Sequence, residues 1–116
     1  MLASIPINAF DDTAVVTFDY DDAFGRACTG IVVRHNGQFH AFRNRCPHWS
    51  TPLDDDGPTP FDPATGEWVC QTHGARFESS TGRCVSGPCR GESLTKFAVE
   101  IEDDRVVVRR QGLDIL

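Results

Sequence analysis

Two short clusters of cysteine and histidine carry the residue types in this chain that can do chemistry. The first is Cys46-Pro47-His48, and the second, after an interval of 21 residues, is Cys70-Gln71-Thr72-His73. Each cluster is short enough to lie on one loop, and each offers one thiolate and one imidazole. A dinuclear iron–sulfur centre can take two thiolates on one iron and two imidazoles on the other. Two such loops therefore meet the ligand requirement of one centre of this kind.

Two other interpretations of the same residues stay open. Two Cys and two His also make a tetrahedral structural zinc site, although finger-like zinc modules usually present their cysteines first and their histidines later, whereas here each cluster mixes the two. Alternatively, the cysteines are buried apolar thiols and the histidines are polar loop residues, an interpretation that leaves their paired order unexplained. Metal analysis separates the iron–sulfur and zinc interpretations.

A glycine, Gly74, directly follows the second cluster, and a glycine beside a ligand lets backbone N–H groups approach the cluster sulfurs. The pattern Cys-x-His, an interval and then Cys-x-x-His-Gly resembles the Rieske iron–sulfur domain. Ser86-Gly87-Pro88 resembles the third, proline-bearing loop that covers the cluster in that family. The resemblance spans nearly the whole chain and implies one [2Fe-2S] cluster with four ligands: Cys46, His48, Cys70 and His73.

The chain departs from the respiratory-complex branch of this family at four positions. That branch carries two further cysteines that form a disulfide, where this chain has Thr51 and Thr72. It also places a serine and a tyrosine near the cluster as hydrogen-bond donors, where this chain has Ala75 and Phe77. Such hydrogen bonds disperse negative charge and raise the reduction potential. Their absence predicts a potential in the lower part of the Rieske range of roughly −150 to +300 mV.

Short β-branched and aromatic runs separated by turn residues predict an all-β fold. Asn36-Gly37 predicts a two-residue type I′ hairpin turn, which needs positive φ at both positions, and Asp103-Asp104 predicts a second hairpin. No segment keeps apolar residues at helical spacing for long, so we expect helix to be limited to a short turn near Asp21 to Phe24. The predicted strands are Ala14 to Phe18, Gly30 to Arg34, Gln38 to Phe42, Leu94 to Ile101 and Arg105 to Arg109.

The segment from Arg45 to Glu67 holds five prolines and two glycines and predicts a long irregular loop. It makes the interval between the two clusters longer than in compact Rieske ferredoxins, and it contains the acidic run Asp54-Asp55-Asp56, which is either a solvated turn or a docking surface. We expect one Rieske domain over residues 1–116, with an antiparallel β-sandwich or barrel-like base and a cluster-binding subdomain at about residues 44–90.

Composition narrows the class of protein further. A length of 116 residues leaves room for one domain, and 17 acidic against 11 basic residues give a net charge of −6, which disfavours nucleic acid and anionic membrane surfaces as partners. The segment from Met1 to Phe10 has no basic region with an apolar run, and no stretch is long enough to span a bilayer. Five cysteines without the spacing of a secreted scaffold favour a reducing compartment. We therefore expect a cytoplasmic protein.

Three cysteines remain outside the ligand set. Cys28, Cys84 and Cys89 are interpreted as ordinary small thiols, because free cysteine packs as a small apolar side chain. Cys84 and Cys89 are close enough in sequence for a local disulfide, and Cys89 follows the covering loop directly. The sequence assigns none of the three a firm role.

The remaining histidines and the tryptophans are also given structural interpretations. His35 and His40 flank the predicted Asn36-Gly37 turn and are expected to be structural or exposed, not ligands. A facial-triad iron site needs two histidines and a carboxylate with open positions, and only these two histidines remain after ligation of the cluster. A hidden oxygenase site is therefore not expected. Trp49 is expected to cover the ligand loop and Trp68 to belong to the core.

The resemblance implies an electron carrier that is not itself an enzyme. The chain is similar to the ferredoxin component of aromatic-ring oxygenase systems, which takes single electrons from an NAD(P)H-linked flavoprotein reductase and delivers them to a terminal oxygenase by transient docking. The alternative is a Rieske-type small subunit of a larger oxidoreductase, similar to that of assimilatory nitrite reductases. A structural zinc-binding module ranks third.

Overall fold

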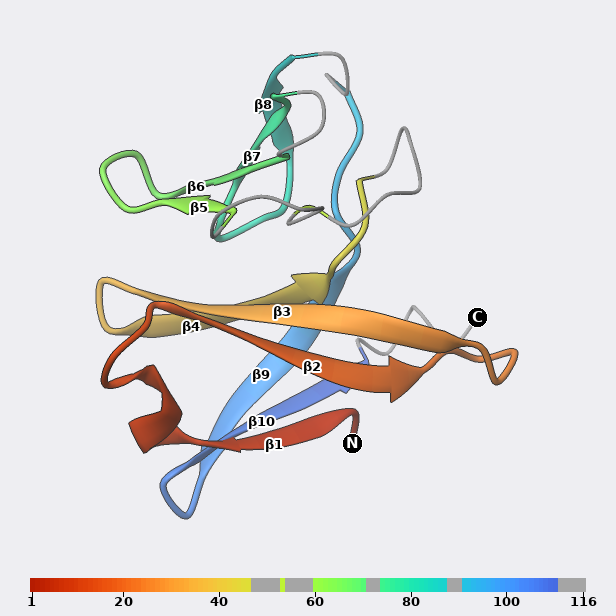
Figure 1. Cartoon of the computed structure of the whole chain (residues 1–116), viewed down its shortest axis with the longest axis vertical. Coiled ribbons are helices and arrows are strands. Elements are labelled where there is room, and N and C mark those ends of the chain that lie inside the picture. Colours follow the sequence, from red (N-terminus) through yellow and green to blue (C-terminus); the bar gives the residue numbers. More distant parts are fainter. Residues whose placement is uncertain (47–52, 54–59, 71–73, 88–90, 111–116) are drawn as a thin grey trace. The chain divides into compact units, whose positions relative to one another are not determined.

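Six antiparallel strands form one sheet from segments near the two ends of the chain (Figure 1). The computed structural model describes residues 1–46, 53, 60–70, 74–87 and 91–110. The sheet belongs to the first of two units, which consists of Met1–Arg43 and the chain from Lys96 onward. Its order is β1-β10-β9-β4-β3-β2, with bounds β1 Ala3–Pro6, β2 Val15–Asp21, β3 Ala27–His35, β4 Gln38–Arg43, β9 Lys96–Glu102 and β10 Arg105–Arg110. The sheet is almost closed and barrel-like, as predicted.

β-Branched and aromatic side chains fill the interior of this unit. Val32, Ala41 and Val106 are fully buried in one cluster that also takes side chains from β1 and β9. Full burial of a valine, isoleucine or phenylalanine side chain contributes about 1.5–3 kcal/mol. An edge-to-face contact between Phe10 and Phe39, with centroids 5.0 Å apart, extends the cluster. The predicted β pattern therefore supplies the core directly.

Both predicted hairpins are confirmed. Asn36 and Gly37 have φ values of 53° and 76°, and the strand residues on either side of them pair between β3 and β4. Asp103 and Asp104 have φ values of 49° and 61°, and they join β9 to β10 in the same way. Two positive φ angles give the turn a twist that matches the twist of the flanking strands. These two turns fix the register of the hairpins on which the sheet is built.

The second unit, Asn44–Thr95, carries a smaller antiparallel sheet. Trp68 and Phe77, which lie opposite one another on neighbouring strands, are fully buried at its centre. The ring of Phe61 meets Trp68 edge-to-face, with centroids 5.3 Å apart. The prediction that Trp68 belongs to the core is confirmed. The order of this sheet is β5-β6-β7-β8, with bounds β5 Phe61–Asp62, β6 Glu67–Val69, β7 Arg76–Glu78 and β8 Cys84–Ser86.

The prediction of a helical turn near Asp21 to Phe24 is wrong. Asp22 Oδ1 accepts the backbone N–H groups of Phe24 and Arg26, both at 2.9 Å, and makes this segment the turn between β2 and β3. Aspartate favours such turns because its side chain competes for backbone donors. Helix within the described residues consists of a 3-10 turn at Ile7–Phe10, η1. No helix of the described part of the chain is long and apolar enough to cross a membrane.

The prediction of an uninterrupted loop from Arg45 to Glu67 is also wrong in its last third. Phe61–Asp62 pairs with Glu67–Trp68, and the turn between them is closed by the Gly66 N–H, which donates to the Asp62 carbonyl at 2.8 Å. A two-residue strand gives no alternating pattern for a sequence to display. Most of the remaining segment, including the acidic run Asp54-Asp55-Asp56, lies outside the described residues.

Candidate metal centre

Cys70 begins the short connection between β6 and β7, and backbone hydrogen bonds close this connection at both ends. The Cys70 N–H donates to the Ala75 carbonyl at 2.8 Å, and the Gly74 N–H donates to the Cys70 carbonyl at 2.8 Å. Gly74 has φ 72°, which a glycine adopts without strain. Cys70 is 1% exposed. The predicted ligand His73 belongs to this connection but lies outside the described residues.

Cys46 is fully buried, three residues after the end of β4. The segment that carries it is bracketed by Asn44 and Leu53. Asn44 Oδ1 accepts the Leu53 N–H at 2.8 Å, and the Leu53 side chain is fully buried. The predicted ligand His48 lies between these two residues and outside the described part of the chain.

The third predicted loop begins at Ser86-Gly87, where β8 ends beside β7. Gly87 has φ 95°, and a Cβ on it would lie 2.8 Å from the Ala75 Cα. Only glycine allows this approach, because any other residue would overlap the backbone there. The start of the third loop therefore packs against Ala75, at the end of the connection that carries Cys70. Pro88 lies outside the described residues.

Ala75 and Phe77 are both fully buried in this unit. Neither side chain has a hydroxyl group, so at these two positions the chain offers no side-chain hydrogen-bond donor to a sulfur atom. The resemblance given in the sequence analysis implies that respiratory Rieske proteins carry donors at these two positions. Thr51 and Thr72, which stand where those proteins carry two further cysteines, lie outside the described residues.

A charged network fastens the strand that follows the second cluster. Arg76 donates to Glu67 Oε1 at 2.9 Å and to Asp62 Oδ2 at 3.2 Å, and so links β7 to β6 and β5. The Ala64 N–H first, and then Arg76, hold the pKa of Asp62 below its usual value. Glu67 and Asp62 in turn raise the pKa of Arg76. Sequence reasoning missed this network because its partners are 9 and 14 residues away from Arg76.

The described residues fit a centre with two thiolate ligands. Cys46 and Cys70 are both buried in the same unit, and each begins or lies within a segment closed by hydrogen bonds. The thiolate is the form that binds metal, and a buried thiolate needs a positive partner such as iron to offset its lost hydration. Among the described residues no three Cys, His, Asp or Glu side chains gather as a metal site, and the two histidines that complete the predicted set lie outside them.

The other described cysteines, Cys84 and Cys28, form hydrogen bonds with protein groups. The Cys84 thiol is buried and donates to the Ser86 carbonyl at 3.3 Å. Cys28 lies partly buried on β3, where its thiol donates to the Arg26 carbonyl and its sulfur accepts from Arg43 Nη2, both at 3.5 Å. Cys89, and with it the predicted local disulfide, lies outside the described residues.

His35 and His40 lie on β3 and β4 and are partly buried. Burial first, and then electrostatic repulsion from Lys96 and His35, lower the pKa of His40 from its usual value. No described cysteine, aspartate or glutamate joins these two histidines in a metal-binding group.

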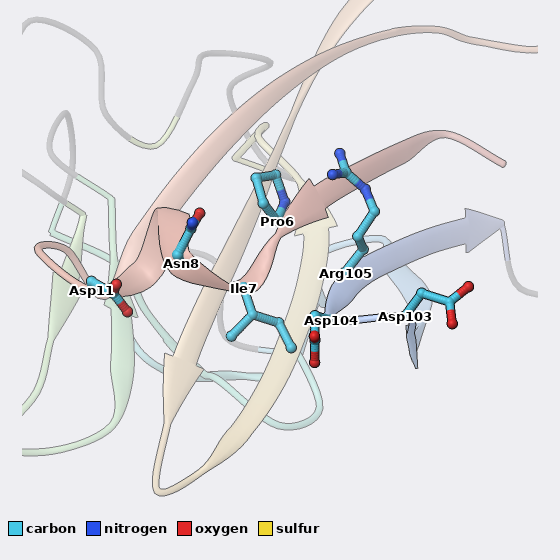
Figure 2. A pocket seen from close by; sticks show the side chains of 7 residues that line it. All are labelled: Pro6, Ile7, Asn8, Asp11, Asp103, Asp104 and Arg105. Atoms are coloured by element: carbon cyan, nitrogen blue, oxygen red, sulfur yellow. The ribbon is translucent and has the colours of Figure 1, made fainter.

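A cavity of about 500 Å³ lies in the first unit, between η1 and the turn that joins β9 to β10 (Figure 2). No cysteine or histidine of the described residues lines it. Figure 2 shows the carboxylates of Asp11, Asp103 and Asp104 pointing in different directions, without a common focus. Arg105 is already engaged, because its guanidinium donates to the Ser4 hydroxyl and carbonyl at 2.6 and 2.8 Å. The cavity therefore lacks the chemistry of the predicted centre.

Tyr20, the single tyrosine of the chain, is expected to ionise only at about pH 12. Burial is the main cause of the raised pKa, while the positive charge of Arg43 opposes it and Cys28 reinforces it. Because the unfolded pKa is 10.0, the folded protein loses stability as pH rises from 10 towards 12. Absorbance at 295 nm, titrated against a Tyr20→Phe control that lacks the step, measures this directly. A step centred near pH 10 contradicts the expectation.

Known proteins are similar to this chain over the segments that carry the two cysteine–histidine clusters. The family model for the Rieske [2Fe-2S] domain matches residues 17–98, a span that contains both cysteine–histidine clusters and the predicted third loop. Apoptosis-inducing factor 3 from Mus musculus is 38% identical over 87 residues, which cover 73% of this chain. The ferredoxin component of the alkene monooxygenase system from Xanthobacter autotrophicus is 28% identical over 83 residues. The chain spans 13% of the length of the first relative and 63% of the length of the second.

Solved structures show the likeness of the fold. The ferredoxin of carbazole 1,9a-dioxygenase from Nocardioides aromaticivorans IC177 superposes with a TM-score of 0.73 at 24% identity, and 95% of each chain is covered. A complex of reduced oxygenase and oxidized ferredoxin in carbazole 1,9a-dioxygenase contains a chain that superposes with a TM-score of 0.73 at 23% identity, over 95% of this chain and 94% of that one. The fold of this chain is thus that of these ferredoxins.

Proposed function

Because the chain belongs to the Rieske [2Fe-2S] domain family, whose members bind one [2Fe-2S] cluster, we propose that it is a ferredoxin that carries single electrons. In this proposal an NAD(P)H-linked flavoprotein reductase supplies the electrons and a terminal oxygenase receives them. The observation that carries the proposal is the match over residues 17–98, which includes both cysteine–histidine clusters in order. The protein acts as a carrier and is not itself an enzyme.

The ligands in this proposal are Cys46 and Cys70 on one iron and His48 and His73 on the other. Burial of Cys46 and Cys70 supports the assignment, because a thiolate at a buried position needs a positive partner such as iron to offset its lost hydration. When bound, the cluster supplies reversible one-electron oxidation and reduction. The chain itself orients the ligands through the closed connection at Cys70 and the bracketed segment at Cys46.

The reduction potential is proposed to lie in the lower part of the range of roughly −150 to +300 mV for Rieske centres. Ala75 and Phe77 support this assignment, because their buried side chains offer no hydroxyl group to a sulfur atom. Without such donors, the extra negative charge of the reduced cluster is less well stabilised. A low potential suits an electron acceptor of a flavoprotein reductase better than it suits quinol oxidation.

The proposed partners are inferred from the relatives of this chain. One relative is the ferredoxin component of an alkene monooxygenase system, and a structurally similar chain occurs in a complex of oxygenase with ferredoxin. Transient docking fits a carrier that must leave one partner to meet the next, because weak redox encounters bury little surface. The net charge of −6 would steer the carrier towards basic surfaces on those partners.

A second candidate function is that of a Rieske subunit or module that serves one larger oxidoreductase. The observation that favours it is the match to apoptosis-inducing factor 3, in which the similar segment makes up 13% of a much longer protein. Stable co-purification with one large enzyme is the expected result in that case. A free monomer that exchanges electrons rapidly with a reductase is the expected result for the ferredoxin.

The experiment that tests the proposed function is EPR spectroscopy of anaerobically purified, dithionite-reduced protein, together with assays of iron, zinc and acid-labile sulfide. We expect about two irons and two sulfides per chain and a reduced-state signal with the low average g value of a histidine-ligated [2Fe-2S] centre. An EPR-silent protein that contains zinc and no sulfide would overturn the electron-transfer proposal and favour the structural zinc module.

A further inference from the structure

Asn44 is a buried polar side chain at the entrance to the first ligand segment. It is 7% exposed and lies two residues before Cys46. Its Oδ1 accepts the backbone N–H of Leu53 at 2.8 Å, a buried hydrogen bond that spans nine positions of the chain. The eight residues between the two partners include the proposed ligands Cys46 and His48.

This hydrogen bond links the two ends of the segment that carries Cys46. Backbone hydrogen bonds do the same for the segment that carries Cys70. The connection that carries Cys70 is closed by two backbone hydrogen bonds, to Ala75 and from Gly74. The first segment is longer, and the side chain of Asn44 makes a contact between its two ends. A buried backbone N–H without an acceptor is costly, so the carboxamide both satisfies Leu53 and fixes the span of the segment.

The chemistry of the side chain also matters. An asparagine accepts the hydrogen bond without bringing a net charge into a buried site, whereas an aspartate of nearly the same shape would accept it with a negative charge. Leucine has the same branched arrangement of side-chain heavy atoms, although it is bulkier, and accepts no hydrogen bond. The three residue types therefore separate shape, hydrogen bonding and charge at one position.

We propose that Asn44 is a positioning residue for the iron–sulfur cluster: its carboxamide links Asn44 to Leu53 and so fixes the buried Cys46, two residues after Asn44, for the binding of iron. This inference rests on the proposed ligand role of Cys46. It assigns to Asn44 a part in retaining the cluster and in shaping its spectrum, with no contact to iron.

The test compares Asn44→Leu and Asn44→Asp with a matched control, Ser79→Ala. Ser79 is the other buried polar side chain among the described residues, it lies in the same unit, and its backbone N–H keeps its bond to the Gly66 carbonyl after substitution. Each protein is purified anaerobically with its cluster. Cluster release to an iron chelator is followed by loss of visible absorbance, and the reduced EPR spectrum and the reduction potential are recorded.

We expect Asn44→Leu to release iron about 10- to 100-fold faster than the parent, the size of effect that the loss of an outer-shell hydrogen bond has on metal affinity, and to give a broadened EPR signal. Asn44→Asp should keep the slow release and the sharp signal, with a lower potential because of its added negative charge. Ser79→Ala should match the parent in all three measurements. If Asn44→Leu fails to acquire a cluster, retention of the cluster by Asn44→Asp carries the same support.

Release rates and EPR spectra of Asn44→Leu that equal those of the parent would overturn the inference while leaving the proposed function intact. Release from Asn44→Asp as fast as from Asn44→Leu would also overturn it, because the acceptor would then not be the feature that matters. A parent protein without a [2Fe-2S] signal would instead overturn the proposed function, and the inference with it.

Discussion

Cys70→Ser is expected to yield a colourless protein whose iron content falls from about two per chain to near zero. The substitution replaces a soft thiolate with a hydroxyl that stays protonated and binds iron poorly. Cys70 is 1% exposed and begins a connection closed by two backbone hydrogen bonds, so the backbone of the variant retains its geometry. Cys46→Ser should give the same loss. Iron, sulfide and visible absorbance measure the effect.

Two other cysteines of the chain provide matched controls for this result. Cys84 is a buried thiol of the same unit, and Cys28 is a partly buried thiol of the first unit. Cys84→Ser and Cys28→Ser should retain the iron, the sulfide and the EPR signal of the parent. A full cluster in Cys70→Ser, or loss of the cluster from Cys84→Ser with retention in Cys70→Ser, would show that the ligand assignment is wrong.

Gly87→Ala is expected to destabilise the protein through two effects that add. The positive φ of 95° is unfavourable for alanine, by roughly 1–2 kcal/mol for a left-handed conformation. The new Cβ would also lie 2.8 Å from the Ala75 Cα, and relieving such overpacking costs about 1–3 kcal/mol. Because Ala75 ends the connection that begins at Cys70, the displacement should also speed cluster loss. Urea unfolding followed by circular dichroism gives the change in stability.

Gly91 offers a control that separates the two effects. It lies in the same unit with nearly the same φ, 93°, but a Cβ on it would meet no atom of the described residues within 4 Å. Gly91→Ala should therefore show the backbone effect alone, and Gly87→Ala should exceed it by about 1–3 kcal/mol. Equal destabilisation by the two variants would mean that the close approach of Gly87 to Ala75 does not affect the free energy of unfolding of Gly87→Ala.

The amino-acid sequence by itself determined the hairpins and displayed the two cysteine–histidine clusters. Asn36-Gly37 and Asp103-Asp104 adopt the positive φ angles that a two-residue turn needs, and this preference resides in the turn residues themselves. The order of cysteine and histidine in each cluster is likewise a local pattern, which can be recognised without knowledge of any long-range contact. Alternating and β-branched runs indicated the strands that flank these turns for the same reason.

Only the tertiary structure decided how distant segments meet. Arg105 donates to Ser4 across 101 positions, and β1 joins β10 although the short run Ala3–Pro6 carries no distinctive pattern. Three further contacts also join separate segments: the hydrogen bond between Asn44 and Leu53, the ion pairs of Arg76, and the packing of Gly87 against Ala75. Local preferences choose a turn or a strand, but burial and hydrogen bonding between remote residues depend on which strands pair, and that choice minimises the free energy of the whole chain.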